Sequence, residues 1–188
     1  GLLGMAAQAQ AVNYVFPGTL PAGCSGSGPS YTCGSLTLGN NDTITFNAPL
    51  PATLTVNGNF STDNAKINAA GSASNLRLVV TGTLATGFKA KVNGDVTAGA
   101  ITDAGGGQSV FGGSLTTTTG AINLAFKTTV AGSITTGSGA VVIDNEGVVS
   151  GSIASTSGPV TLKFKSEVAG SVNTAGTVTL QDQVTVTG

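Results

Sequence analysis

The sequence predicts an all-β fold, a single-stranded β-solenoid (β-helix) of about eight coils, about 19 residues per coil, with a disulfide-closed N-terminal cap. The first observation behind this prediction is a glycine that recurs at a fixed interval. Consecutive copies are 19 residues apart, and the last follows after 18: Gly94, Gly113, Gly132, Gly151, Gly170 and Gly188. The second observation is that apolar residues flank each glycine two positions away, as Val130 and Ile134 flank Gly132.

The third observation is a short alternating pattern between the turns. Apolar residues separated by one position, such as Val141 with Ile143, indicate strands that bury one face. The turn-forming sequences TTTTG, TTGSG, STSG and NTAG interrupt them. One coil cannot bury its apolar face by itself, so the coils should stack at about 4.8 Å per coil. Equivalent Val, Ile and Leu residues would then form ladders that fill the interior.

A longer repeat of 38 residues involves phenylalanine. Phe88, Phe126 and Phe164 begin the segments FKAKV, FKTTV and FKSEV, and the equivalent positions between them hold Gly107 and Asn145. We predict that the three rings form a core ladder that stacks inward on alternate coils. Large and small residues should alternate there because stacked coils leave too little room for a ring in every layer.

The next column along the chain is expected to face solvent. Its members alternate between lysine and a Gln or Glu: Lys89, Gln108, Lys127, Glu146, Lys165 and Gln183. This alternation avoids repulsion between stacked lysines and allows Glu146 to pair with Lys127 and Lys165. We interpret the column as a solvated face, and the alternative is a cationic stripe for an anionic glycan.

The chain divides into three segments. Residues 1–11 look like a signal-peptide remnant, because Ala9-Gln10-Ala11 has the A-x-A pattern of a cleavage site; a flexible apolar tail is the alternative. We expect residues 12–35 to form the N-terminal cap and residues 36–188 to form the solenoid. The early coils are less regular, and SNLRLVVTGTL should hold a bulge or a shifted turn. Export implies a secreted protein that is extracellular or attached to the cell surface.

The two cysteines fit the same compartment. Cys24 and Cys33 bracket the eight-residue segment SGSGPSYT, and in an oxidising environment they should pair. A metal site would need more ligands, and the chain has no histidine to supply them. We therefore predict a disulfide that closes a short, hairpin-like loop in the cap.

Composition argues against several classes of function. Seven basic and eight acidic residues give a net charge of -1, which offers no footprint for nucleic acid. No apolar run approaches the roughly 18 residues of a membrane span. The absence of histidine removes the usual general base, and Arg77 is the single arginine, so we expect neither an enzyme nor a cofactor. The likeness to β-helix polysaccharide lyases is one of architecture alone.

Two other interpretations remain open at this stage. Calcium could bind at Asp103 or Asp144, since GGGQS resembles one unit of a calcium-binding nonapeptide repeat. Ice binding is the other, because flat solenoid faces with T-x-T ladders have that activity. The outward pairs beside the glycines lose this character towards the C-terminus: Ser114/Thr116, Ser133/Thr135, Ser152/Ala154 and Ser171/Asn173.

Two stretches resemble known families. The phrases VAGSITT and VSGSIAS look like the coils of bactofilin-type, polymer-forming β-solenoids. The block NYVFPGTLPAGCSGSG...YTCGSLTLGNNDTITF, followed by GSASNLRLVVTGTL, resembles the N-terminal region of large bacterial surface proteins of mannose-sensitive haemagglutinin (MSHA) pilus biogenesis, Q type. This resemblance covers most of residues 12–188. It implies a surface location and a structural or adhesive role, without chemistry.

The expected function is that of a structural subunit in an extracellular bacterial filament or surface appendage. The partner would be the chain itself, joined head to tail as a homopolymer by end-to-end stacking. The expected assembly edges are Val12, Tyr14 and Phe16 at one end and Val184 and Val186 at the other. The alternative is a monomeric surface adhesin that binds glycans along an outer face. Its exposed aromatic residues would be Tyr14 and Tyr31.

Overall fold

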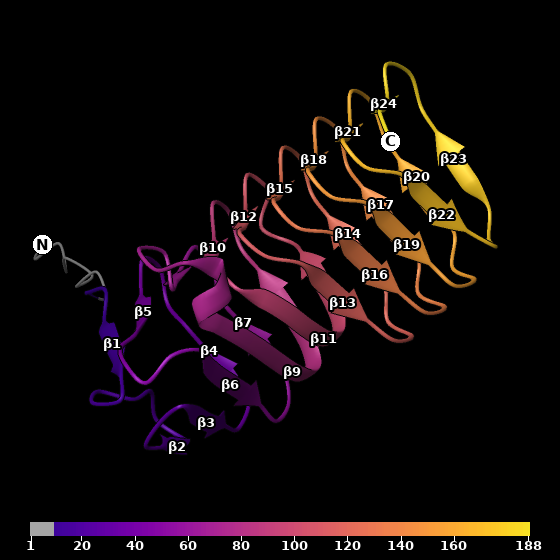
Figure 1. The fold of residues 1–188 in the computed structure, drawn as a ribbon. Helices are drawn as coiled ribbons and strands as arrows, with labels where there is room; N and C mark the ends of the chain where they lie inside the picture. Colours follow the sequence, from indigo (N-terminus) through magenta and orange to yellow (C-terminus); the bar gives the residue numbers. More distant parts are fainter. Residues whose placement is uncertain (1–9) are drawn as a thin grey trace, which may run out of the picture.

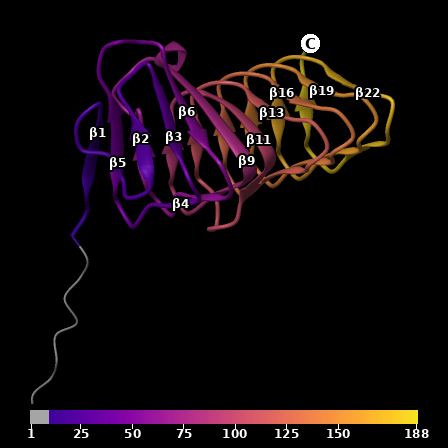
Figure 2. The same ribbon diagram turned by 90° about the horizontal axis from the view of Figure 1, so that it is seen from below.

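The computed structural model describes residues 10–188 and shows the predicted all-β solenoid (Figure 1). Successive coils stack along one axis from the β1 end to the β22 end, as the view from below also shows (Figure 2). The strands form two hydrogen-bonded sheets, and the larger sheet bends around a corner into two faces. The signal-peptide prediction for residues 1–11 lies almost wholly outside the described residues.

The first face is a sheet of nine short parallel strands. They are β1 (Asn13–Phe16), β5 (Thr43–Phe46), β8 (Lys66–Ile67), β10 (Lys91–Val92), β12 (Val110–Phe111), β15 (Thr129–Val130), β18 (Val148–Val149), β21 (Glu167–Val168) and β24 (Thr185–Val186). Each coil of the solenoid contributes one of these strands.

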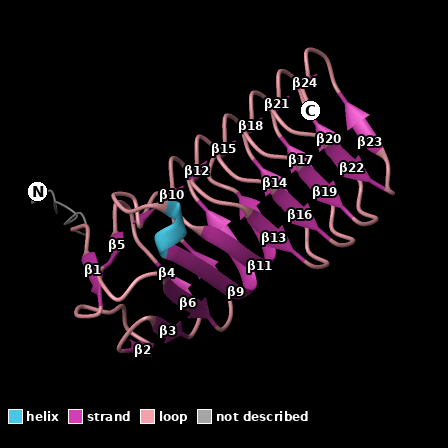
Figure 3. Cartoon of the chain, viewed as in Figure 1, coloured by secondary structure: helices cyan, strands magenta, loops and turns pink. Residues whose placement is uncertain are grey.

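The second face begins with an antiparallel hairpin and continues with parallel strands. Its members are β2 (Cys24–Gly26), β3 (Ser30–Cys33), β6 (Ala52–Val56), β9 (Leu76–Thr86), β11 (Asp95–Asp103), β13 (Leu115–Thr117), β16 (Ile134–Thr136), β19 (Ile153–Ser155) and β22 (Val172–Thr174). A single turn of 3-10 helix, η1 (Ala73–Asn75), precedes β9 and is the cyan element of Figure 3.

The third face is shared with the second because β9 and β11 run across the corner between them. The remaining strands of this face are β4 (Leu36–Thr37), β7 (Phe60–Ser61), β14 (Ile122–Leu124), β17 (Val141–Ile143), β20 (Val160–Leu162) and β23 (Val178–Leu180). The pairing of β9 with β11 slips at the corner, where Ala98 faces Val80 but Ala100 faces Thr83. The irregularity expected in SNLRLVVTGTL is therefore present.

The interior consists of the predicted apolar ladders. Leu115, Ile134 and Ile153 pair in a strict 19-residue register and are fully buried. Period-two alternation along each strand turns every second side chain inward, and stacking then excludes water from the whole column. Threonine and serine join this core at one column, where Thr117 donates its hydroxyl hydrogen to the carbonyl of Gly120 and lies 3.0 Å from the hydroxyl of Thr136.

The phenylalanine ladder is on the surface, so its predicted inward orientation was wrong. Phe88 and Phe126 are 42% and 37% exposed, and Phe164 is partly exposed. Each ring occupies the first position of a two-residue turn whose second residue has a positive φ, for example 55° at Lys127. That left-handed residue breaks the alternation on which the prediction relied. The core at this corner is filled two positions later by small residues: Ala90, Ser109, Thr128, Gly147 and Ser166.

The segment expected to cap the solenoid is itself a coil. β1 pairs in parallel with β5, β3 pairs in parallel with β6, and β2 folds back along the outer edge of β3. Inside this coil Phe16 lies 4.8 Å from Tyr31 between ring centroids and 5.0 Å from Phe46. Three aromatic rings therefore close the interior at this end of the described chain.

Candidate functional site

The predicted disulfide joins the two strands of the terminal hairpin. Cys24 and Cys33 are cross-strand partners in β2 and β3, and their sulfur atoms are bonded. The bond fixes the hairpin against the first coil, because β3 continues the parallel sheet through β6. The structure thus confirms this pair and gives it a structural role at the rim of the solenoid.

The expected N-terminal assembly edge is only partly available. Val12 is 41% exposed and Tyr14 is half-buried, but Phe16 is fully buried in the aromatic cluster. The alternation along β1 turns Phe16 inward, so it cannot contact another molecule without unfolding. Tyr31 is also buried, contrary to the expectation of an exposed aromatic residue. Its hydroxyl has no hydrogen-bond partner among the described residues, and burial raises the pKa of this phenol.

The side chains of the apolar core columns have their largest exposed fractions in the last coil. Leu180 and Val178 are 54% and 44% exposed, whereas Leu162 and Val160, one coil earlier in the same columns, are fully buried. Val186 is 36% exposed, and Val184 is half-buried against the core. The strands of this coil, β22, β23 and β24, have strand partners on one side only within residues 10–188. Within the described residues this coil therefore combines exposed apolar side chains with strands that are paired along one edge.

A second surface feature is the stack of turns that carries the phenylalanines. We define the Phe–Lys ridge as residues 88–89, 107–108, 126–127, 145–146, 164–165 and 182–183, one pair per coil. Hydrogen bonds between coils hold it straight: the N–H of Lys89 donates to Gly107, that of Gln108 to Phe126, and the same contact recurs down to Asp182. The ridge therefore has the regularity of the sheets although no strand forms it.

Electrostatics along the ridge are balanced. Each lysine places its ammonium over the ring of the phenylalanine before it, with Nζ 4.8 to 5.0 Å from the ring centroid. Lys127 also pairs with Glu146 at 3.3 Å, as expected, and Lys163 pairs with Asp144 at 3.4 Å beside the ridge. Both pairs are solvent-exposed, so each stabilises the fold little. Of the three ridge lysines, Lys127 is thus neutralised, whereas Lys89 and Lys165 have no ion pair among the described residues.

Asp103 is buried, so the calcium interpretation does not suit it. Its carboxylate is 4% exposed and accepts hydrogen bonds from Thr86 at 3.1 Å, Ser109 at 3.0 Å and Thr128. These hydroxyl donors come from the coil below, the same coil and the coil above. Within residues 10–188 no group of three or more His, Cys, Asp or Glu residues is placed to hold a metal ion.

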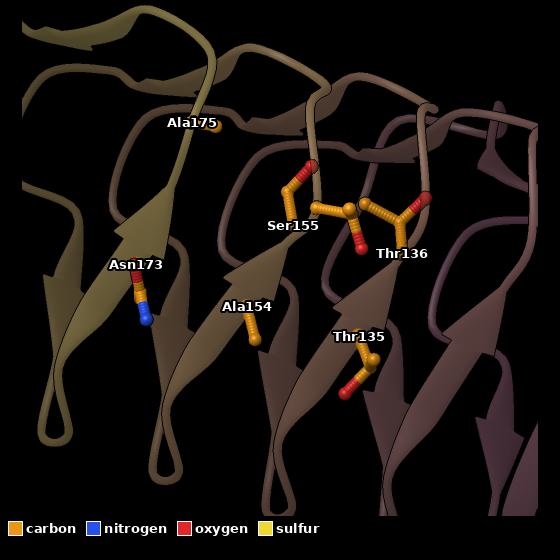
Figure 4. A pocket seen from close by; sticks show the side chains of 7 residues that line it. Thr135, Thr136, Ala154, Ser155, Asn173 and Ala175 are labelled. Atoms are coloured by element: carbon orange, nitrogen blue, oxygen red, sulfur yellow. The ribbon is translucent and has the colours of Figure 1, made fainter.

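One depression lies at the corner of the second and third faces near the C-terminal coils. Figure 4 shows Thr135, Ala154 and Asn173 side by side on successive strands, with Thr136 and Ser155 beyond them. No titratable side chain lines it. The nearby serine ladder is used structurally, because the hydroxyl of Ser133 accepts the backbone N–H of Ser152, and this contact repeats between coils. The arrangement lacks a nucleophile with an adjacent base.

Comparison of the chain with models of protein families, with curated proteins and with solved structures finds no match. The bactofilin-type and MSHA-type resemblances therefore stay predictions from the quoted motifs. No helix in the described part of the chain is long and apolar enough to cross a membrane.

Proposed function

We propose that this chain is a structural subunit of an extracellular bacterial filament or surface appendage, and that it assembles by end-to-end stacking of solenoids. The observation that carries the proposal is the repeat of the apolar columns, in which each coil buries its Val, Ile and Leu side chains against the next coil. An uncovered parallel edge accepts a further strand, from the same polypeptide or from another one.

The repeat itself supports stacking between molecules. Neighbouring coils already bind each other through apolar ladders and backbone hydrogen bonds, and the last four coils add contacts between Ser114, Ser133, Ser152 and Ser171. Ser171, in the last coil, has its N–H bound to the Ser152 hydroxyl, and its own hydroxyl is exposed. A coil from a second copy could extend this ladder by the same contacts. Head-to-tail joining of this kind is heterologous and grows into a filament.

A pair of adjacent substitutions tests the proposal. Leu180→Lys puts a charge into the apolar column that a second copy would bury in the proposed end-to-end contact. Thr179→Lys puts the same charge at the neighbouring position of β23, whose side chain points away from the interior. Electron microscopy should show filaments for the unmodified chain and for Thr179→Lys, but only short rods for Leu180→Lys. A buried unpaired charge costs several kcal/mol, which is enough to abolish the contact. Rods alone for the unmodified chain would refute the proposal.

The proposed location is secreted, extracellular or at the cell surface. The Cys24–Cys33 disulfide supports it, because such bonds persist in oxidising compartments. The proposal assigns no catalytic residue and no cofactor.

Glycan binding by a monomeric adhesin is the alternative, and the exposed rings of Phe88 and Phe126 are the observation in its favour. A lysine over each ring and the Lys127–Glu146 ion pair make it the weaker candidate.

A further inference from the structure

We propose that the Phe–Lys ridge is a pairing surface through which two copies of this chain associate side by side in antiparallel orientation. The inference is independent of end-to-end stacking, because the ridge runs along the flank of the solenoid and does not involve the strand edges through which coils would stack end to end. It rests on two properties of the ridge, the alternation of its side-chain size and the alternation of its charge.

Size alternates strictly from layer to layer. Counted from 88–89 to 182–183, the first, third and fifth of the six layers carry phenylalanine, and the others carry Gly107, Asn145 and Asp182. Rings on one copy are two coils apart, about 9.6 Å, so a ring entering the gap would lie about 4.8 Å from each neighbour. Aromatic pairs pack at centroid separations of about 4.5 to 7 Å. The gaps therefore have the width to admit rings from an identical ridge, and the lysines that lie over the rings in the single chain would turn towards the partner.

A twofold axis midway between the third and fourth layers produces this interdigitation. It places the first layer of one copy opposite the sixth of the other, the second opposite the fifth, and the third opposite the fourth. Every ring then meets a small or polar residue: Phe88 with Asp182, Phe126 with Asn145 and Phe164 with Gly107. A twofold contact of this kind is isologous and closes as a dimer.

The same axis also matches charge. It places Lys127 opposite Glu146 of the other copy, Lys165 opposite Gln108, and Lys89 opposite Gln183 with Asp182 beside it. The Lys127–Glu146 ion pair within each copy would exchange for two equivalent pairs between copies. No lysine faces a lysine and no acid faces an acid. A surface whose charge pattern complements its own inverted copy favours self-association over other partners.

Parallel pairing does not have this property. A twofold axis parallel to the ridge would place each layer of one copy opposite the same layer of the other copy. Phenylalanine layers would then meet phenylalanine layers, and Lys127 would face Lys127 of the second copy. Like charges would then approach at five layers, those of Lys89, Lys127, Glu146, Lys165 and Asp182, and the gaps would face each other unfilled. The geometry therefore selects the antiparallel arrangement and a single register.

Disulfide trapping tests the register directly. The double variant Gln108→Cys/Lys165→Cys places two cysteines three coils apart in one chain, about 14 Å, which is too far for an internal bond. Across the proposed axis the same two positions face each other. The matched control is Gln108→Cys/Gln183→Cys, whose positions do not oppose one another in this register. Both variants are made in the Leu180→Lys background, so that end-to-end contacts do not contribute.

We expect mild oxidation to give a covalent dimer with a 108–165 intermolecular bond, identified by peptide mass spectrometry. Its yield should exceed that of the control at least tenfold, and Phe126→Ser in the same background should reduce it to the control level. Equal yields in the two variants would overturn the register. A chain that sediments as a monomer at every concentration and binds a polysaccharide in a Phe126-dependent manner would overturn the pairing and assign the ridge to glycans.

Discussion

Phe111 and Phe126 share a residue type but differ in their relation to the turn. Phe111 lies in β12, where alternation directs its ring into the core, and it is fully buried. Phe126 lies one position before a left-handed residue, and its ring is 37% exposed beneath the ammonium of Lys127. The stability that each ring contributes should differ accordingly.

We predict that Phe111→Ala lowers the free energy of unfolding by about 3–5 kcal/mol, the usual cost of emptying a buried aromatic site. Phe126→Ala should cost less than about 1 kcal/mol, because only a partly exposed contact and a cation–π interaction are lost. Urea unfolding of the two variants under conditions that keep the protein monomeric measures the difference. Equal losses would place Phe126 in the core after all.

At the scale of single elements, the junction of β9 and β11 depends on a polar cluster. Asp103 ends β11 in a column that continues with Leu124, Ile143 and Leu162 in later coils. A carboxylate is tolerated in this interior column because hydroxyl groups from three successive coils bind it. The cluster therefore joins the irregular early coils to the regular later ones.

Removing the carboxylate should loosen that junction. Asp103→Ala leaves the hydroxyls of Thr86 and Thr128 without their acceptor, whereas the Ser109 hydroxyl keeps the Gly87 carbonyl at 2.9 Å, and the change should destabilise the protein by roughly 2–4 kcal/mol. Asp103→Asn keeps one acceptor oxygen and the side-chain shape, so its loss should be smaller. The urea midpoints of the two variants provide the measurement. A more stable Asp103→Ala variant would show that burying the carboxylate costs more than its hydrogen bonds return.

At the scale of the whole molecule, the fold is close to one-dimensional. Each coil contacts mainly the coils before and after it, so a local change should stay local. The disulfide and the aromatic cluster lie together at the N-terminal end of the described chain, where, within residues 10–188, the first coil has a stacked neighbour on one side only. Stability at this end therefore depends on cross-linking more than it does in the middle.

We predict that Cys24→Ser/Cys33→Ser removes about 2–3 kcal/mol of local stability, the usual contribution of a short disulfide loop. Hydrogen exchange should accelerate in β1 to β3 and remain unchanged in β13, β16 and β19. Mass spectrometry of deuterated peptides resolves the two regions within one sample. Uniform acceleration along the chain would show that the solenoid unfolds as one cooperative unit.

The sequence by itself determined the fold class, the coil length, the inward Val, Ile and Leu columns, the irregularity before Gly94 and the Cys24–Cys33 bond. Each of these depends on spacing along the chain, and a 19-residue period with two-residue alternation has few other structural solutions. The Lys127–Glu146 pair could be predicted for the same reason, since both residues occupy one column on adjoining coils.

The tertiary structure alone decided which residues at the corners face inward. Phe126 lies an even number of positions from both Leu124 and Val130, so alternation assigns it to the core. The left-handed conformation of Lys127 interrupts the alternation, so Phe126 points outward. This conformation is held by the next coil, because the N–H of Lys127 donates to the carbonyl of Asn145. Phe16 and Tyr31 were expected at the surface but lie in the core, because the terminal segment is a coil with an interior of its own. Local alternation determines orientation within a strand, whereas contacts between coils determine it at the turns.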